Sequence, residues 1–391
     1  MHSIKSYINY ASLYAIFLTV YHFHESLHIV NPWIIRILYV IIGIVSVYCA
    51  IKVLSKERKN PFFISVNLLL VYIFIHGIVY YLSDVTHYNY ITGNYINKIQ
   101  FTTDVFYGFL PIYAFYYFSQ NNKINEGWIS FYLIFYLLLS VGEYTYNALN
   151  YFAEYIYRDS MTNNTSYEFV SLFPLLVFFR KYTIPQMLLL GCMLFYMVSG
   201  AKRGAIIIGI ICLVYFFYSS YKDTPKSKYL YVFIILIAIF IGFNFFRDLI
   251  LNDDYFLERI EATLSGDSSG RDKIYSKLWK HYINTGLPFQ IFGSGAYSTI
   301  QVAGNLAHQD WLELAIDCGI IGCILYFMFF YSFKNTIVKI KSNVLKSSLY
   351  LSIIIMFLKS LYSMSYSSLS IPLAISIGYC LAMRDNKQYY E

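Results

Sequence analysis

The sequence has 391 residues, of which 58% are hydrophobic and 13% are charged, and its mean hydropathy is +0.50. Soluble globular domains carry roughly a quarter charged residues, so this composition excludes an ordinary soluble protein. The formal net charge of +7 arises mostly from lysines in predicted cytoplasmic loops near anionic lipid, so it gives no reason to expect a nucleic-acid partner.

The apolar residues fall in long continuous runs, which are typical of membrane-spanning helices. A helix needs about 20 mostly apolar residues to cross a bilayer, and these runs are too continuous for the strands of a barrel. We therefore predict an all-α polytopic membrane protein with about twelve transmembrane helices. The two short runs 167–180 and 184–200 could instead form one broken helix or a re-entrant pair. The predicted ranges are 7–23, 33–54, 62–83, 99–119, 128–149, 167–180, 184–200, 204–221, 229–246, 309–333, 344–363 and 367–383.

The distribution of Lys and Arg among the short loops predicts the orientation of this bundle. Cytoplasmic loops carry an excess of these residues, and alternate loops are rich in them, which places both termini in the cytoplasm. The first run has no small-residue cleavage site, so we expect an uncleaved helix rather than a signal peptide. The basic residues predicted inside are Lys5, Lys52, Lys56, Arg58, Lys59, Lys123, Arg180, Lys181, Lys222, Lys226, Lys228, Lys334, Lys339, Lys341, Lys346, Arg384 and Lys387, and those outside are Lys98, Arg158, Lys202, Arg203 and Lys359.

Lys202 and Arg203 occupy a narrow gap between two apolar runs, in the segment LFYMVSGAKRGAIIIGIICLVYFF. The predicted orientation places this gap outside, where short cationic loops are disfavoured. A miscounted helix is the plainer alternative. Because charge near a membrane is costly and tends to mark function, we interpret the pair as a site for an anionic group on the outer side.

One long hydrophilic segment divides the chain into helices one to nine (1–246), a large outer loop with short helices (247–307) and the last three helices (308–391). Within the loop, SGDSSGRDKIYSKLWKHYINT predicts a turn and then a helix, with Ser269 or Ser268 as N-cap and Arg271 in the first turn. Free N–H groups beside a guanidinium suit an anion such as phosphate, although a solvated helix start is an alternative.

The segment FGSGAYSTIQVAGNLAHQDWLELAIDCGIIGCILYFMFF begins with a flexible glycine turn, Gly293 and Gly295, and ends as a predicted span. His308 lies at the outer mouth of that span. Acidic residues then recur at helical spacing, so one face of the predicted membrane helix carries an imidazole and then acids. Such acids need partners, and Arg203 or Arg271 would serve. The acids are Asp310, Glu313 and Asp317.

These residues predict an outer site with two or three cations, an imidazole that can take up a proton near neutral pH, and no metal or other cofactor. The chemistry that suits this set is displacement of a phosphate-type leaving group, with arginines stabilising its charge and histidine activating a hydroxyl. Asp253 and Asp254 are adjacent, which is more typical of a solvated loop than of a metal pair. We interpret as structural the remaining histidines (His22, His24, His28, His76, His87, His281) and all six cysteines (Cys49, Cys192, Cys212, Cys318, Cys323, Cys380).

The motifs SGAKRGAI and AHQDWLELAIDCGIIG, with the Arg-headed loop helix and the glycine turn between them, resemble the O-antigen polymerase and O-antigen ligase superfamily. The resemblance is specific over about 199–330. Two features depart from the family pattern: its Ser-Arg pair is spread here to Ser199 and Arg203 with Lys202 between them, and Gln309 replaces the usual Asn.

The resemblance implies a GT-C-like bundle in a bacterial inner membrane that acts on undecaprenyl-diphosphate-linked glycans at the periplasmic face. Arg203 and Arg271 would bind the diphosphate, and His308 would act near the acceptor hydroxyl, so these three are the catalytic candidates. The acids at 313 and 317 would orient the cations. Candidates for binding the diphosphate or glycan are Lys202, Ser269, Gly293, Gly295, Glu313 and Asp317.

The function that we predict is an inverting, metal-independent O-antigen polymerase, which transfers the growing glycan from undecaprenyl diphosphate to a sugar hydroxyl of another lipid-linked repeat unit. Its partners would be these donor and acceptor lipids, membrane lipid and a chain-length regulator. The alternatives are a ligase that transfers the glycan to lipid A-core and, less favoured, a flippase. Three further charges near or within the spans stay unassigned, although a transporter would use such charges: Arg36, Glu143 and Lys359.

Overall fold

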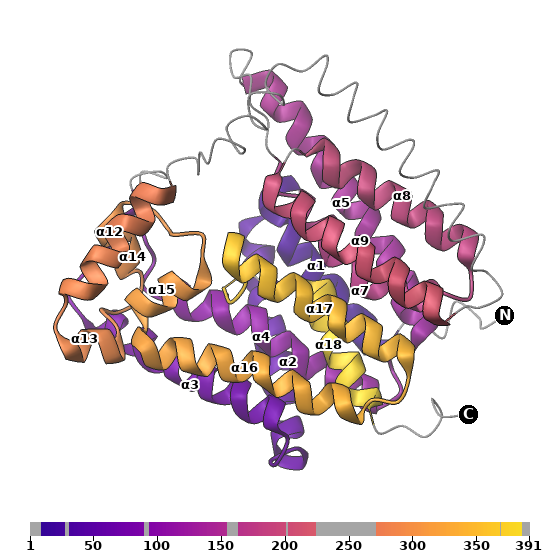
Figure 1. Cartoon of the computed structure of the whole chain (residues 1–391), viewed down its shortest axis with the longest axis horizontal. Coiled ribbons are helices and arrows are strands. Elements are labelled where there is room, and N and C mark those ends of the chain that lie inside the picture. The colour runs from indigo at the N-terminus through magenta and orange to yellow at the C-terminus, as the bar shows by residue number, and fades with distance from the viewer. Residues whose placement is uncertain are drawn as a thin grey trace.

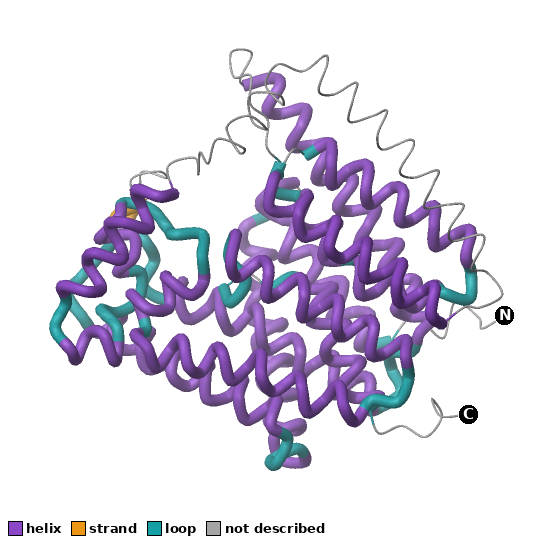
Figure 2. Tube along the Cα trace, viewed as in Figure 1, coloured by secondary structure: helices purple, strands orange, loops and turns teal. Residues whose placement is uncertain are grey.

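The computed structural model describes residues 9–27, 31–89, 94–154, 163–200, 202–223, 271–367 and 369–384. In these ranges the chain is almost entirely helical, with one short antiparallel hairpin in which Tyr88 pairs with Tyr95 (Figure 1, Figure 2). The predicted all-α class is confirmed. The elements are α1 (Tyr10–Leu27), α2 (Pro32–Lys56), α3 (Pro61–Leu82), β1 (Tyr88–Asn89), β2 (Asn94–Tyr95), α4 (Gln100–Gln120), α5 (Glu126–Glu154), α6 (Ser166–Ser171), α7 (Phe173–Leu176), η2 (Val177–Phe179), α8 (Thr183–Ser199), α9 (Arg203–Asp223), α12 (Arg271–Asn284), α13 (Leu287–Phe292), α14 (Ser298–Ala303), α15 (Asp310–Asp317), α16 (Gly319–Lys339), α17 (Asn343–Tyr362) and α18 (Ile371–Met383).

Within the described residues, six helices are long and apolar enough to cross a membrane, and three shorter apolar helices accompany them. The predicted span 229–246 lies outside the described residues. The range 167–180 is a chain of short helices, α6, α7 and η2, rather than one continuous span. The six long candidates are Trp33–Lys56, Pro61–Leu82, Glu126–Leu149, Arg203–Lys222, Gly319–Lys339 and Asn343–Tyr362, and the shorter helices are Ser166–Phe179, Thr183–Ser199 and Ile371–Met383.

Short sequence signals mark the starts of α2 and α3. Asn31 and Asn60 each precede a proline at the first helical position, and their side chains accept hydrogen bonds from the N–H groups of Trp33 and Phe62. An Asn cap followed by Pro suits a helix start, because proline lacks the N–H group that would otherwise be unpaired there. The sequence thereby sets where α2 and α3 begin.

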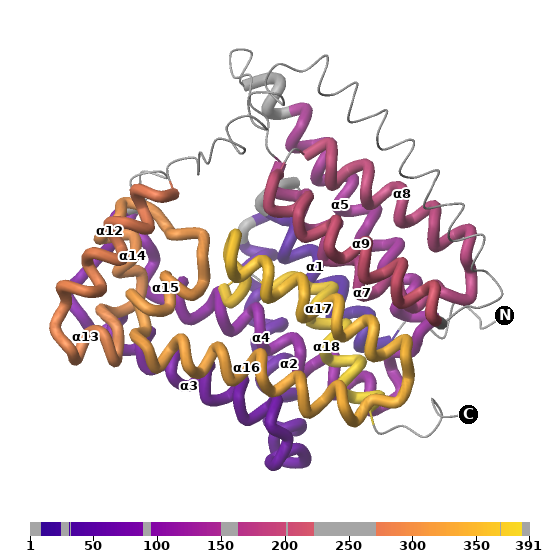
Figure 3. The backbone as a smooth tube through the Cα atoms, in the orientation of Figure 1, coloured from indigo at the N-terminus to yellow at the C-terminus, as the bar shows by residue number. Residues whose placement is uncertain are grey.

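The last helices pack among the first ones. Figure 3 shows α18 in yellow beside α4 in purple, and these two helices share an extensive contact. Polar side chains add links between helices: the Ser348 hydroxyl on α17 donates to the Pro174 carbonyl (2.8 Å) and lies 2.8 Å from the Ser376 hydroxyl on α18. Such links are common between helices that pack in an apolar environment.

The predicted span 309–333 is wrong in one respect, because two helices replace it. α15 ends at Asp317, and α16 begins at Gly319, whose φ of +67° is a left-handed conformation. A Cβ atom at Gly319 would lie 2.3 Å from the Ile291 carbonyl oxygen, so only glycine allows this close approach. The acids of α15 therefore lie on a separate short helix that precedes the candidate span.

Helices α12, α13, α14 and α15 form a lobe at one end of the bundle (Figure 1). The Tyr72 hydroxyl of α3 links the lobe to the bundle, because it lies within hydrogen-bond distance of the carbonyl oxygens of Phe292 (3.2 Å) and Cys318 (2.9 Å). The turns at the opposite ends of α3 and α16 carry Arg58, Lys59 and Lys341. The lobe and these cation-rich turns therefore occupy opposite ends of the same helices.

Candidate functional site

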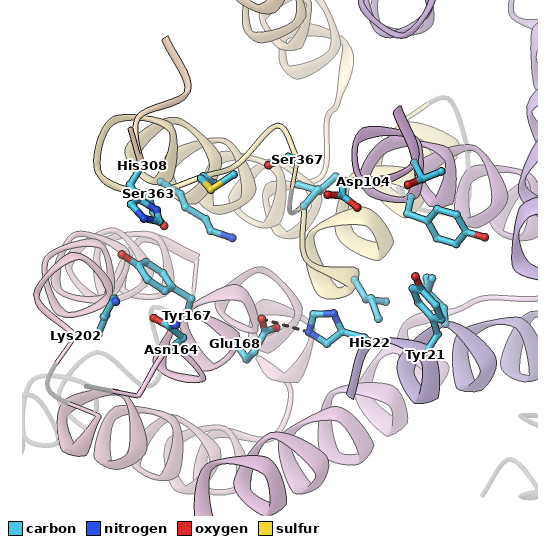
Figure 4. Close-up of a pocket in the computed structure, with 18 of the residues that line it drawn as sticks. Tyr21, His22, Asp104, Asn164, Tyr167, Glu168, Lys202, His308, Ser363 and Ser367 are labelled. Atoms are coloured by element: carbon cyan, nitrogen blue, oxygen red, sulfur yellow. Dashed lines mark ion pairs between the residues drawn. The ribbon is translucent and has the colours of Figure 1, made fainter. Parts of the chain in front are cut away.

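A cavity of about 720 Å³ lies where the bundle meets the lobe (Figure 4). Its walls come from α1, α2, α4, α6, α17 and α18, together with the start of α12 and the segments that precede α6, α9, α15 and α18. The lining residues are Leu18, Tyr21, His22, Tyr39, Thr103, Asp104, Tyr107, Gly108, Asn164, Tyr167, Glu168, Lys202, Arg271, His308, Lys359, Ser363, Met364, Ser367, Leu369 and Ile371.

Three of the residues singled out from sequence meet in this cavity: Lys202, Arg271 and His308. Lys202 directly precedes α9, and Arg271 is the first residue of α12, where its Nη1 donates to the Tyr362 carbonyl at 2.9 Å. His308 has a φ of +54° and donates its backbone N–H to Glu313 Oε1 at 2.8 Å. This bond to Glu313 fixes the backbone at a position whose side chain faces the cavity.

Burial lowers the pKa of His308, and the positive charges of Arg271 and Lys202 lower it further. A free histidine titrates near 6.5, so the His308 imidazole is neutral at pH 7. A neutral imidazole can accept a proton. The two cations nearby would attract an anionic group to the same space.

The other predicted site residues have different positions. Arg203 opens α9 beside Lys202, but it is not among the residues that line the cavity. Ser269 lies outside the described residues, so its predicted role as N-cap of α12 is not described. Gly293 and Gly295 have φ values of +90° and +105° and lie in the turn that follows α13.

The glycine turn packs against the junction of α15 and α16 rather than lining the cavity. Ser294 N–H donates to the Ile316 carbonyl (2.7 Å), and Gly295 N–H donates to the Asp317 carbonyl (3.1 Å). A Cβ atom at Gly293 would lie 2.3 Å from that Asp317 carbonyl oxygen. The close approach of the two backbones therefore explains why a glycine occupies position 293.

The carboxylates of α15 accept hydrogen bonds from backbone groups within the lobe, and the expectation that Glu313 and Asp317 orient the arginines stays a prediction. Asp317 accepts from the Tyr297 N–H (3.1 Å), the Thr299 N–H (2.9 Å) and the Thr299 hydroxyl (2.7 Å), so it caps the start of α14. Glu313 accepts from the His308 N–H. These carboxylates therefore hold the loops of the lobe, and Glu313 acts on the cavity through the backbone of His308.

Asp310 ties the lobe to the loop between α17 and α18. It accepts from the N–H groups of Ser365 (2.9 Å) and Tyr366 (3.1 Å) and from the Tyr326 hydroxyl (2.8 Å). Burial raises the pKa values of Asp310 and Asp317 to about 7 and that of Glu313 well above its ordinary value. The bonded loop contributes Ser363, Met364 and Ser367 to the cavity wall, so Asp310 shapes the site without lining it.

Two charged side chains that the sequence analysis did not assign to the site, Glu168 and Lys359, also line the cavity. His22 Nε2 of α1 lies 3.4 Å from Glu168 Oε1 of α6 (Figure 4). The Tyr136 hydroxyl donates to Glu168 Oε2 at 2.5 Å. Lys359 lies 5.7 Å from the centre of the Tyr167 ring. The signal available in the sequence was the presence of an acid and a lysine within apolar runs, because such charges usually have buried partners.

The remaining unassigned charges have separate surroundings. Arg36 lies on α2 over the ring of Trp33, 5.0 Å from its centre, and neither residue lines the cavity. Glu143 is buried on α5 and also lies outside the cavity lining. Of the three charges left open by the sequence, only Lys359 is a cavity residue.

Comparison with protein families covers the segment that carries three of the lining residues. Residues 188–327 match the family model described as O-antigen ligase, a segment that includes Lys202, Arg271 and His308. No curated protein matches the chain. The segment 188–327 is therefore similar to the O-antigen ligase family, within a chain that carries helices long and apolar enough to cross a membrane.

Proposed function

We propose that the protein is an O-antigen polymerase, which joins lipid-linked repeat units at the cavity between bundle and lobe. The observation that carries the proposal is the meeting of Lys202, Arg271 and a neutral His308 in one cavity. Cations next to a proton acceptor suit a reaction in which a hydroxyl displaces a diphosphate. The cavity volume of about 720 Å³ lies within the usual range for ligand sites.

The reaction would proceed as one displacement. The acceptor hydroxyl oxygen attacks the anomeric carbon of the donor sugar, and its proton passes to the imidazole of His308. The bond between the anomeric carbon and the diphosphate oxygen breaks, and its electron pair leaves with undecaprenyl diphosphate. Lys202 and Arg271 stabilise the charge of that leaving group. Attack opposite to the leaving group inverts the anomeric carbon, and the step needs no further reactant.

We place the protein in the bacterial inner membrane with the cavity toward the periplasm. The cation-rich turns that contain Arg58, Lys59 and Lys341 lie at the end of the bundle opposite the lobe. The excess of cations in cytoplasmic loops supports a cytoplasmic position for these turns and a periplasmic one for the lobe. Lipid-linked donor and acceptor units would then reach the cavity from the membrane, and a chain-length regulator would act on the same face.

Transfer to lipid A-core is the second candidate function, because the matching family model is described as O-antigen ligase. Both reactions displace undecaprenyl diphosphate and would use the same cations and the same imidazole. They differ in the acceptor alone. The gel pattern of the cell-surface glycan separates them.

The test is a glycan-ladder gel of cells that lack the gene and are complemented with wild type, Arg271→Ala, His308→Ala or Lys277→Ala. Lys277 is an exposed residue of α12 away from the cavity lining, which makes it the matched control. A polymerase predicts core with a single unit when the gene is absent, and a ladder restored by wild type and Lys277→Ala only. Core without units, together with accumulated lipid-linked polymer, would identify a ligase. Ladders restored by both cavity variants at wild-type protein levels would refute the site.

A further inference from the structure

A second cavity of about 340 Å³ adjoins the main one. The two cavities share three lining residues, Asp104, Met364 and Ser367. On its other side this second cavity, which we call the side cavity, reaches the surface at Gln100 and at Tyr95, which is 73% exposed. The side cavity therefore lies between exposed residues near the β1–β2 hairpin and the main cavity.

Aromatic rings form much of the wall of the side cavity. Phe101 and Tyr297 meet edge to face with ring centres 5.4 Å apart, and Tyr366 and the exposed Tyr95 also line it. Tyr297 has a φ of +59°, and its N–H donates to the buried Asp317. A residue of this size rarely adopts a left-handed conformation, so the bond to Asp317 stabilises a strained placement of the ring.

The polar groups of the side cavity gather at its junction with the main cavity. Asp104 Oδ2 lies 3.5 Å from the Tyr297 hydroxyl, and Ser367 lies at the same junction. In Figure 4, Asp104 lies on the side of the main cavity away from Lys202 and His308. A carboxylate repels a diphosphate and accepts hydrogen bonds from hydroxyl groups. The junction therefore suits an uncharged, hydroxyl-rich ligand.

We propose that the side cavity is a carbohydrate subsite, which holds the acceptor glycan and directs its hydroxyl past Asp104 into the main cavity. The proposal rests on the proposed function, because it assigns the second of the two glycans that a transferase must bind together. Flat rings offer an apolar surface to the C–H face of a sugar, and a carboxylate binds its hydroxyls by charge-assisted hydrogen bonds. The donor diphosphate occupies the cationic side, so the two ligands approach from opposite sides.

The test uses the full-length protein in lipid nanodiscs with two separate substrates. The donor is the lipid-linked repeat unit extracted from cells that lack the gene. The acceptor is the same repeat unit released from its lipid and labelled at its reducing end, so that it lacks a diphosphate and can serve as acceptor only. Transfer is measured against the concentration of each substrate, which separates the KM of the acceptor from that of the donor.

Gln100→Trp places a bulky ring at the exposed mouth of the side cavity, and Lys277→Trp, at an exposed position of α12 that lines neither cavity, is its matched control. We expect Gln100→Trp to raise the acceptor KM at least tenfold and Lys277→Trp to leave it within twofold. Asp104→Asn keeps the shape of the side chain but removes its charge, and should raise the acceptor KM about tenfold, as expected for one charge-assisted hydrogen bond. The donor KM and the thermal midpoint should stay unchanged in all three variants.

An acceptor KM that is the same in Gln100→Trp and Lys277→Trp would overturn the subsite, and so would equal rises in donor and acceptor KM in Asp104→Asn. A wild-type protein that joins lipid-linked units but does not extend the soluble unit would also overturn it, since a sugar-binding subsite should accept the released glycan. If wild type transfers nothing between lipid-linked units, the proposed function itself fails. The wild-type reaction therefore distinguishes the two failures.

Discussion

Removal of the Asp317 side chain should destabilise the lobe strongly. This carboxylate is 1% exposed and accepts three hydrogen bonds, from Tyr297 N–H, Thr299 N–H and the Thr299 hydroxyl. Burial raises the pKa of Asp317 to about 7, so its neutral and charged forms are both present at neutral pH. Hydrogen bonds contribute about 0.5–1.5 kcal/mol each to a neutral group and about 1.5–3 kcal/mol each to a charged one. Removing a buried charge recovers part of the contribution of the charged form. We therefore expect Asp317→Ala to lower the free energy of unfolding by about 3–5 kcal/mol.

Two measurements would check this prediction. Thermal unfolding in detergent should give a lower midpoint for Asp317→Ala, and hydrogen exchange should be faster over Ser298–Ala303, the α14 helix that Asp317 caps. Thr299→Val removes one of the partner hydroxyls, so its effect should not add fully to that of Asp317→Ala in a double-mutant cycle. Unchanged exchange in α14 together with an unchanged midpoint would refute the capping role.

Three further predictions concern the cavity and its supports. Burial and two cations lower the pKa of His308 below the ordinary histidine value of about 6.5. The rate of transfer should therefore fall only when the pH drops below about 6.5. A kcat/KM profile whose acidic limb lies above that pH would contradict a neutral His308 base. Arg271→Lys keeps the charge but loses the planar fork and the bond to the Tyr362 carbonyl, so transfer should drop roughly 10–100-fold, whereas transfer at the wild-type rate would show that charge alone suffices. Gly319→Ala should lower the free energy of unfolding by about 3 kcal/mol or more, because φ is +67° and the Ile291 carbonyl oxygen lies 2.3 Å from the new Cβ. Gly142→Ala is the control, because no atom lies within 4 Å of its Cβ, and it should change that free energy by no more than about 1 kcal/mol. Equal effects of the two substitutions on thermal unfolding would contradict the packing argument.

The arrangement of the site separates binding from support. Lys202, Arg271 and His308 face the cavity. Glu313 does not line the cavity and accepts from the backbone N–H of His308, whereas Asp317 accepts from backbone N–H groups at the start of α14. Substitutions of the cavity residues and of these two acids should therefore differ in their effect on stability.

Sequence patterns located most of the helices and the main residues of the site. Apolar runs long enough to cross a bilayer predict helices because the backbone must satisfy its hydrogen bonds internally there. Asn-Pro pairs mark the starts of α2 and α3, because the cap and the missing N–H act locally. The resemblance to a family motif implied Arg203, Arg271 and His308 as catalytic candidates, with Lys202 as a candidate for binding, and Arg203 is not among the residues that line the cavity. The structure brings Lys202, Arg271 and His308 into one cavity.

The tertiary structure decided what local patterns cannot encode. The break at Gly319 depends on the Ile291 carbonyl, which approaches from another helix. The partners of Asp317 lie in a loop that folds back on α15, so helical spacing alone suggested a membrane face instead of a cap. Glu168 meets His22 because α1 and α6 both pack against α5. Side chains distant in sequence acquire their roles through packing, whereas the sequence by itself determined the helices, because their apolar runs and caps act over neighbouring residues.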